Sequence, residues 1–441
     1  MTLWGGRFNK SPSQSMRDLS RSVHFDWRLA PYEIEVNLVH LSNLIKQKIV
    51  TKSDGEILQK GLLDLAGEIG SGKFTYNHDD EDVHSAIERG LVEKCGVLGG
   101  SIRAGRSRND LVITDFKLYL ADHLLEIASE IASLAKSFNT QALNQIDVIA
   151  PGFTHTQHAQ PITFGQELSK HSHALVRDID RIFDWIDRNN YSPFGAGALA
   201  GSSIQPEPET SASKLGFNGV MENSIDAVSD RDFAAEALFI MAMIGIHLSK
   251  IGEEFVLWSS TEFDWVEIDD AYATGSSIMP QKKNADVAEL ARGKSGRFIG
   301  NLTALLVVLK AMPFAYNRDL QEDKEPIFDS VDQLLVLLPA ITGMVETAKF
   351  KQANISKGAA AGYSLATEIA DFLSKTGVPF SVAHEVAGEC VKFCEENKID
   401  LAQMSDQQLV AMHPNLTPAV KKFPGQYPHA PRPWEHQEIQ C

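Results

Sequence analysis

The segment 275–284 has the side chains best suited to chemistry, in the order Gly-Ser-Ser-Ile-Met-Pro-Gln-Lys-Lys-Asn. A long helical pattern follows directly, so we expect a loop that leads into the N-terminus of a helix. Free backbone N–H groups and the positive end of the helix dipole bind anions at such a junction. Lys282 and Lys283 add full positive charges. On residue types alone, the segment predicts an anion site, with a solvated loop as the alternative.

Three further segments place polar groups beside predicted helices. His155 lies within Gly-Phe-Thr-His-Thr-Gln (152–157). Two arginines lie within Gly-Arg-Ser-Arg-Asn-Asp (105–110), where a loop enters a long helical pattern and where arginines suit bidentate binding of a carboxylate. The segment 316–324 would place Gln321 and Lys324 on one face if it formed a single helix. Taken separately, these segments also fit a loop histidine, a charged helix start and an ordinary surface turn.

In this order, the four segments resemble the signature blocks of the fumarase/aspartase superfamily, in the form found in argininosuccinate lyases. Three more blocks match the same family, at residues 3–8, 81–84 and 226–233. The resemblance extends from residue 3 to about residue 415. The ordered set of blocks is specific to the argininosuccinate lyases within the superfamily.

The resemblance implies a β-elimination that splits argininosuccinate into arginine and fumarate. A base removes a proton from the carbon next to a carboxylate, and the neighbouring carbon then expels nitrogen. The negatively charged intermediate needs preorganised donors and cations, and the leaving nitrogen needs a proton. No cofactor and no metal are implied. The acidic, histidine-containing run 78–84 also lacks a fixed ligand spacing and is not interpreted as a metal site.

Four catalytic residues follow from the resemblance. Ser276 is the implied base, which is plausible for a hydroxyl only if the loop closes, excludes water and stabilises the alkoxide through backbone N–H groups and Lys282. Gly275 supplies the flexibility for closure. His155 is the implied acid for the leaving group, and Glu289, just over one turn into the next helix, is its implied orienting partner.

The resemblance also implies a set of substrate-binding residues from distant parts of the chain. They are Ser22, His84, Arg108, Asn109, Thr154, Ser277, Asn284, Tyr316, Gln321 and Lys324. His158 is expected to be structural. The glycine-rich segment 195–201 is only weakly similar to a dinucleotide-binding loop, because no strand precedes it.

Composition limits the partners and the location. The 441 residues are 43% hydrophobic and 22% charged, as in soluble globular proteins. A net charge of −17 disfavours a nucleic-acid partner, although a cleft can still attract an anionic substrate. The four cysteines are too few for a disulfide framework, and no signal-peptide pattern is present, so we expect a cytoplasmic protein. The most apolar run, 235–248, is too short to span a bilayer and predicts a buried core helix.

Helical periodicity dominates the middle of the chain. One apolar stripe has spacings of three and four residues over more than seven turns, through Ile113, Phe116, Leu120, Leu124, Ile127, Ile131, Leu134 and Phe138. Such helices need a bundle to bury their apolar faces, so we expect a mostly α protein with a central long-helix bundle. The resemblance implies three helical domains, 1–107, 108–357 and 358–441, and a homotetramer whose subunits share active sites.

The chain departs from the family pattern at a few positions. Leu111 replaces a glutamine, Arg103 stands where many members have histidine, and Ala285 replaces a proline. The tail 423–441 is rich in proline where the family is rich in glycine. Two alternatives therefore stay open: a sister C–N lyase acting on another N-substituted aspartate, and a catalytically weak paralogue with a structural role. The retained catalytic side chains argue against the second.

Overall fold

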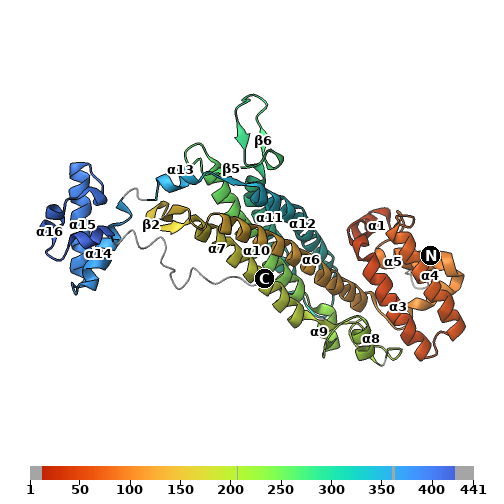
Figure 1. The fold of residues 1–441 in the computed structure, drawn as a ribbon. Coiled ribbons are helices and arrows are strands. Elements are labelled where there is room, and N and C mark those ends of the chain that lie inside the picture. The colour runs from red at the N-terminus through yellow and green to blue at the C-terminus, as the bar shows by residue number, and fades with distance from the viewer. Residues whose placement is uncertain (1–11, 206, 360–362, 423–441) are drawn as a thin grey trace. The chain divides into compact units, whose positions relative to one another are not determined.

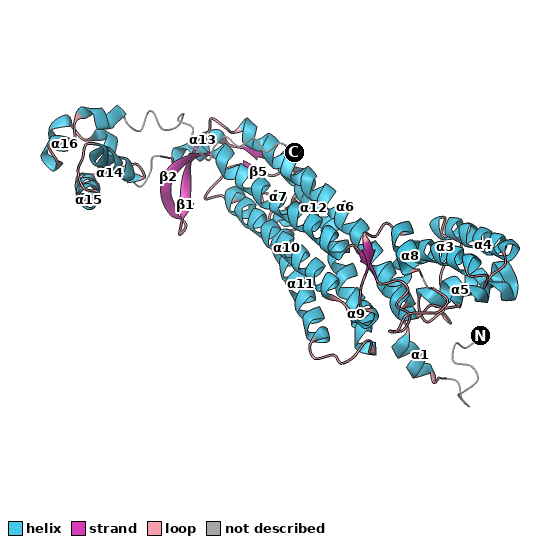
Figure 2. Ribbon diagram, turned by 90° about the horizontal axis from the view of Figure 1, so that it is seen from below, coloured by secondary structure: helices cyan, strands magenta, loops and turns pink. Residues whose placement is uncertain are grey.

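The fold is mostly α-helical, which confirms the predicted fold class (Figures 1 and 2). A computed structural model describes residues 12–205, 207–359 and 363–422 of the chain. The sequence block 3–8 and the proline-rich tail 423–441 lie outside the described residues. In the described part, the strands are short and form two-stranded sheets.

Five long helices form the centre of the fold and lie side by side in both views (Figures 1 and 2). The apolar stripe predicted between Ile113 and Phe138 is buried, with each of its side chains at most 1% exposed. Burial of this stripe holds the first long helix against its neighbours. The five helices are α6 (Arg108–Asn144), α7 (Phe164–Asn189), α10 (Asp232–Ser259), α11 (Asp286–Leu309) and α12 (Lys324–Thr347).

The chain divides into two compact units, and each takes part of every long helix. The first unit comprises Met1–Ser129, Asp178–Ile244 and Ser295–Leu335. The second comprises Glu130–Arg177, Gly245–Lys294 and Val336–Cys441. The division into domains 1–107, 108–357 and 358–441 stays a prediction.

The first unit contains the shorter helices from the N-terminal third of the chain. Their ends follow local capping rules: Thr51 caps α4, and Asp82 with Ser85 forms a capping box at the start of α5. A parallel pair joins β3 (Tyr191–Ser192) to β4 (Gly219–Val220). The other elements are α1 (Gln14–Ser20), α2 (Val23–Asp26), η1 (Trp27–Leu29), α3 (Ala30–Lys46), α4 (Lys52–Gly70), α5 (Val83–Cys95), η2 (Gly96–Arg103), α8 (Pro208–Lys214), α9 (Ser224–Ser229) and η4 (Arg318–Asp323).

The second unit carries three antiparallel strand pairs. These are β1 (Ile149–Thr154) with β2 (Gln157–Thr163), β5 (Val266–Glu267) with β8 (Lys349–Phe350), and β6 (Thr274–Gly275) with β7 (Lys283–Asn284). Helices α10 and α11 approach closely in this unit, because a Cβ on Gly252 would overlap the carbonyl oxygen of Ala288. That close approach fixes the first turn of α11, which carries Glu289.

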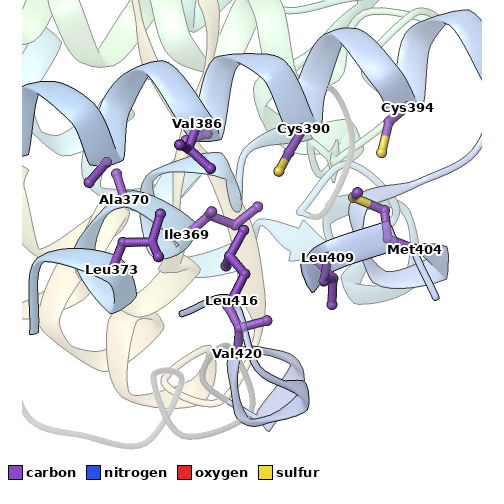
Figure 3. Close-up of a cluster of buried hydrophobic side chains, with 12 residues drawn as sticks. Ile369, Ala370, Leu373, Val386, Cys390, Cys394, Met404, Leu409, Leu416 and Val420 are labelled. Carbon is purple, nitrogen blue, oxygen red and sulfur yellow. The ribbon is translucent and has the colours of Figure 1, made fainter. Parts of the chain in front are cut away.

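The C-terminal part of the second unit has its own apolar cluster, centred on α14 and α15 (Figure 3). Cys390 and Cys394 lie one turn apart on α15 and are fully buried in this cluster, beside side chains such as Leu409 and Leu416. The prediction that both cysteines serve packing is therefore confirmed. The elements of this part are α13 (Gln352–Lys357), α14 (Ala366–Lys375), α15 (Phe380–Asn397), η6 (Leu401–Gln403), α16 (Asp406–Met412) and η7 (Pro418–Lys422), and η3 (Asp270–Tyr272) precedes β6.

Two helical segments of the described chain are long and apolar enough to cross a membrane by composition. They are Asp232–Ser259 and Arg318–Thr347, and 56% and 61% of their most apolar windows are buried inside the protein. The first contains the apolar run 235–248, where Ala237, Leu238, Met241, Ile244 and Leu248 are fully buried. This confirms the prediction of a buried core helix.

Candidate active site

The first unit contains a cleft of about 210 Å³ that gathers most of the predicted substrate-binding residues. Its lining comes from the N-terminal helices, the start of α6 and the junction of η4 with α12. The predicted residues in this lining are Ser22, His84, Arg108, Asn109, Tyr316, Gln321 and Lys324. The other three, Thr154, Ser277 and Asn284, belong to the second unit. The cleft also includes Ser20, Asp26, Glu81, Asp82, Val112 and Arg318, which the sequence did not single out individually.

The start of α6 places Arg108 and Asn109 in the cleft. Asp110 fixes this end of the helix, since one oxygen accepts from the backbone N–H of Ser107 at 3.0 Å and the other from Gly195 and Gly197 at 3.1 and 2.9 Å. Burial raises the pKa of Asp110 to about 6, although these hydrogen bonds oppose the shift. The glycine-rich segment 195–201 thus supports α6 with its N–H groups.

Leu111, a departure from the family pattern, points away from polar surroundings. Its side chain is 2% exposed and packs in an apolar cluster with Val36, Phe194, Ala212 and others. An amide at this position would need hydrogen-bond partners in an apolar site. Leucine therefore suits its immediate neighbours and leaves Asn109 in the cleft.

The segment 316–324 changes from a 3₁₀ helix to an α-helix where it lines the cleft. Gln321 lies in the 3₁₀ helix η4 and donates a hydrogen bond to Tyr316 Oη at 2.9 Å, whereas Lys324 is the first residue of α12. A single helix over 316–324 is therefore not formed. Gln321 and Lys324 still meet at the cleft, because η4 leads directly into α12.

Charged groups in the cleft pair with one another in this chain. Arg108 lies 3.0 Å from Asp82 and 3.4 Å from Glu81, and Arg318 lies 3.1 Å from Glu81. A substrate carboxylate would compete with these carboxylates for the guanidinium groups, which bind carboxylates through paired N–H donors. The cleft can therefore exchange internal ion pairs for contacts to a dianionic ligand.

Asp26 is the most perturbed carboxyl in the cleft, and the sequence did not point to it. Ser22 donates to one of its oxygens at 2.6 Å, and the backbone N–H of Val83 donates to the other at 3.0 Å. Burial, followed by the charge of Asp82, raises the pKa of Asp26 to about 6. Only packing of α2 against the start of α5 brings these groups together.

In the second unit, His155 lies at the tip of the β1–β2 hairpin. Thr154 pairs with Gln157, so His155 and Thr156 form a two-residue turn, with φ values of 54° and 57°. Such a turn needs left-handed backbone at both positions, which glycine and asparagine adopt most readily. A histidine and a threonine there are strained, and backbone strain of this kind is concentrated at functional sites. The His155 side chain is exposed.

A second cavity, of about 540 Å³, lies beside this hairpin. It is lined by Phe153, Thr156, Gln157, His158, Glu262, Phe263, Trp265 and Gly358. His158 packs edge-on against Phe153, with the ring centroids 5.1 Å apart. This contact agrees with the structural part expected for His158.

The segment 275–284 is a hairpin loop whose ends are paired. Thr274 pairs with Asn284 and Gly275 with Lys283 in β6 and β7, and α11 begins at Asp286. Asp286 accepts from the N–H and hydroxyl of Thr274, at 3.0 and 2.6 Å. The loop does lead into a helix N-terminus as expected, but the strand pair was not anticipated.

The predicted catalytic residues all belong to the second unit. Ser276 is half-buried, and its Oγ accepts a hydrogen bond from the backbone N–H of Met279 at 3.1 Å, whereas Lys282 and Glu289 are exposed. Within the part of the chain that the structure describes, the side chains of His155 and Glu289 make no hydrogen bond to each other. The expected pairing of His155 with Glu289 is thus absent within this single chain.

Comparison with known protein families identifies the class of this protein. Residues 6–300 match the family model described as lyase, and residues 363–423 match the model described as argininosuccinate lyase C-terminal. The first match alone covers more than half of the chain. The protein is therefore a lyase of the fumarase/aspartase type.

Individual relatives identify the family within this class. The argininosuccinate lyases of Frankia casuarinae and Saccharopolyspora erythraea are each 52% identical, covering 96% and 95% of this chain and 91% and 88% of their own lengths. A crystal structure of EDDS lyase in complex with formate is 27% identical, with a TM-score of 0.78, and the match covers 92% of this chain and 83% of that one. The chain belongs to the argininosuccinate lyase family.

Proposed function

We propose that this chain catalyses the elimination of fumarate from argininosuccinate, releasing arginine. The observation that carries the proposal is the cleft of the first unit, where Arg108 and Lys324 lie with five other predicted substrate-binding side chains. Three cations, Arg108, Arg318 and Lys324, and several neutral donors suit a ligand with carboxylates. Identity of 52% to argininosuccinate lyases over almost the whole chain supports the same substrate.

The proposed chemistry uses two proton transfers, one from the carbon next to the C–N bond and one to the leaving nitrogen. The Ser276 alkoxide takes the proton from the carbon next to a carboxylate, and that electron pair forms the new C=C bond as the C–N bond breaks. His155 gives a proton to the leaving guanidino nitrogen. Lys282 and the loop N–H groups stabilise negative charge on Ser276 and on the intermediate. Glu289 orients His155.

The proposed assembly is a cytoplasmic homotetramer with shared sites. Large apolar side chains remain exposed along α11 and α12 of the single chain, among them Leu290, Leu306, Val307 and Val336 at 52% to 68%. Large apolar side chains exposed on a surface often mark subunit interfaces. Among the described residues, the absence of a hydrogen bond between His155 and Glu289 also supports a site completed by another subunit.

The direct test is to incubate the purified protein with argininosuccinate and follow fumarate and arginine. Equal amounts of both products, and no product from a Ser276→Ala control, are expected. The similarity to EDDS lyase makes EDDS the comparison substrate. Faster fumarate release from EDDS than from argininosuccinate would show that EDDS is the better substrate. If neither compound released fumarate, a paralogue with a structural role would describe the protein better.

A further inference from the structure

A buried group of three titratable side chains lies against the cleft of the first unit. Glu33 on α3, His84 on α5 and Asp115 on α6 have oxygen or nitrogen atoms that all lie within 4.8 Å of one another. Glu33 and Asp115 are fully buried, and His84 is 7% exposed. Only His84 of the three lines the cleft.

Glu33 has partners on both oxygens. His84 Nδ1 lies 2.6 Å from Oε2, and Asn37 Nδ2 donates to Oε1 at 2.9 Å. Arg106 lies 3.7 Å from Oε1, and its side chain is also nearly buried. Glu33 is therefore well suited to remain an anion, since a cation and two donors surround it.

Asp115 has the opposite environment. Among the described residues, no N–H or O–H group hydrogen-bonds either of its oxygens, and His84 Nδ1 approaches no closer than 3.9 Å. Two charged carboxylates in one dry site would repel each other, and Asp115 would have no donor among the described residues in place of its hydration, so one proton must remain on the pair. Burial and then the charge of Glu33 raise the pKa of Asp115 well above its usual range.

The two ring nitrogens of His84 differ in their hydrogen bonding. Nδ1 contacts Glu33, whereas Nε2 makes no hydrogen bond in the described part of the chain. Burial alone would lower the pKa of His84, but the charge and hydrogen bond of Glu33 outweigh burial and raise it. Asp26, Asp82 and Arg108 also act electrostatically on the ring, whereas Arg106 acts on Glu33 and Lys324 acts on Asp26.

We propose that Glu33 and Asp115 form a carboxyl pair that holds a single proton and positions His84 as a charged donor, whose Nε2–H binds a carboxylate of the substrate. Glu33 and Asp115 are positioning residues, because neither lines the cleft. The inference rests on the proposed function for the nature of the ligand, a dicarboxylate with the succinate skeleton. It adds a further cation to Arg108, Arg318 and Lys324, which also line the cleft.

A metal ion is the competing explanation for these three residues. Ligand atoms around a tetrahedral ion with bonds of about 2.1 Å lie roughly 3.4 Å apart. The 2.6 Å separation of His84 Nδ1 from Glu33 Oε2 is too short for that arrangement and fits a charge-assisted hydrogen bond. The geometry therefore favours a proton over a metal.

The test measures binding of succinate, which needs no turnover, by calorimetry on the assembled enzyme between pH 6 and pH 8. Glu33→Gln removes the anion that keeps His84 charged. We expect its dissociation constant, relative to the parent, to rise by about 10-fold at pH 8 and to recover towards pH 6, where the imidazole is protonated again. Asp115→Leu should also weaken succinate binding. Asp115→Asn should weaken it less than Asp115→Leu does, because the amide supplies a neutral donor to Glu33.

Glu81→Gln is the matched control, because Glu81 pairs with Arg108 and Arg318 in the cleft but does not contact His84. The succinate affinity of Glu81→Gln should have the same pH dependence as that of the parent. If Glu33→Gln fails to fold, succinate binding to His84→Gln is measured instead. Its affinity should be about 10-fold lower than that of the parent, by a factor that does not vary with pH. Parent-like affinity of Glu33→Gln or His84→Gln at pH 8 would overturn the proposal. So would tight binding of Zn²⁺ to the parent that Glu33→Gln abolishes. The argininosuccinate assay of the parent judges the proposed function separately.

Discussion

The ammonium group of Lys324 lies 2.6 Å from Oδ1 of Asp323, and both side chains are at most 4% exposed. The second oxygen of Asp323 accepts from Nε of Arg231, which is itself 1% exposed. A buried carboxylate therefore lies between two cations, and one of these, Lys324, lines the cleft. The ion pair holds a substrate-facing cation in place.

Asp323→Asn should lower the free energy of unfolding by roughly 3 kcal/mol, because it leaves two buried cations without their anion. Although burial opposes it, Lys324 and Arg231 lower the pKa of Asp323, so this stabilisation is present above an unfolded pKa of about 3.9 and is lost as the pH falls through the lower folded value. Urea unfolding at pH 7 measures the effect. Glu207→Gln, which breaks the solvent-exposed pair with Lys46, should have a much smaller effect, because water screens that pair. Equal losses for both variants would contradict the account.

Asp115→Asn should change the pH dependence of stability. The folded protein keeps Asp115 protonated, because its pKa is raised, whereas the unfolded chain releases that proton above about pH 3.9. The contribution of Asp115 to folding stability therefore becomes less favourable as the pH rises. An asparagine amide does not titrate, so it has no such pH-dependent cost. The melting temperature of Asp115→Asn relative to the parent should rise between pH 5 and pH 8. A relative melting temperature that falls over this interval would mean that Asp115 is ionised in the fold.

The sequence predicted the elements that have strong local signals. The spacing of Ile113 to Phe138 predicted α6, and the apolar run 235–248 predicted a buried helix within α10, because burial of an amphipathic or apolar face follows directly from periodicity. Family blocks also predicted the residues that gather in the cleft of the first unit. These predictions needed no information about which helices pack together.

The remaining features depend on contacts between distant segments or on unusual backbone. Glu33 and Asp115 are 82 residues apart in sequence, and each alone fits the polar face of a helix. Only packing of α3 and α6 shows that they share a dry site. The tight turn at His155 and Thr156 has neither glycine nor asparagine, so turn propensity did not predict the β1–β2 hairpin.

Ser276→Ala should lower kcat by at least ~10²-fold, the usual scale for loss of a general base. Stability should change by less than about 1 kcal/mol, since the hydroxyl is only half-buried and its contacts are to loop N–H groups. Initial rates over a range of argininosuccinate concentrations separate kcat from KM. The neighbouring Ser277→Ala should act mainly on KM. Near-normal turnover by Ser276→Ala would exclude it as the base.

The loop 275–284 should close on its ligand. Its base is held by the bonds from Thr274 to Asp286 and by the pair of Lys283 with Asp270 at 2.6 Å, whereas residues 277–283 are exposed. Hydrogen exchange of the loop amides should slow by about 10-fold on adding fumarate and arginine, because closure shields them from water. Amides in the middle of α11 serve as the internal control. Unchanged exchange in the loop at saturating ligand would count against closure.

The active site should be assembled from more than one subunit. His155 is exposed at a hairpin tip, and Glu289, its expected partner, is exposed on the first turn of α11 without a hydrogen bond to it in the described chain. A histidine that acts as an acid needs an orienting partner. A second copy of the chain can supply it, since equivalent surfaces meet in symmetric assemblies.

Mixing two inactive proteins tests this arrangement. His155→Ala and Ser276→Ala are each expected to be inactive, and they are combined after mild dissociation and then reassembled. If His155 and Ser276 of one site come from different chains, random assortment gives roughly a quarter of sites with both residues intact, so substantial activity should return. If both come from one chain, every site keeps one lesion. A mixture that stays inactive, although mass spectrometry shows exchanged subunits, would refute sharing and leave the elimination chemistry untouched.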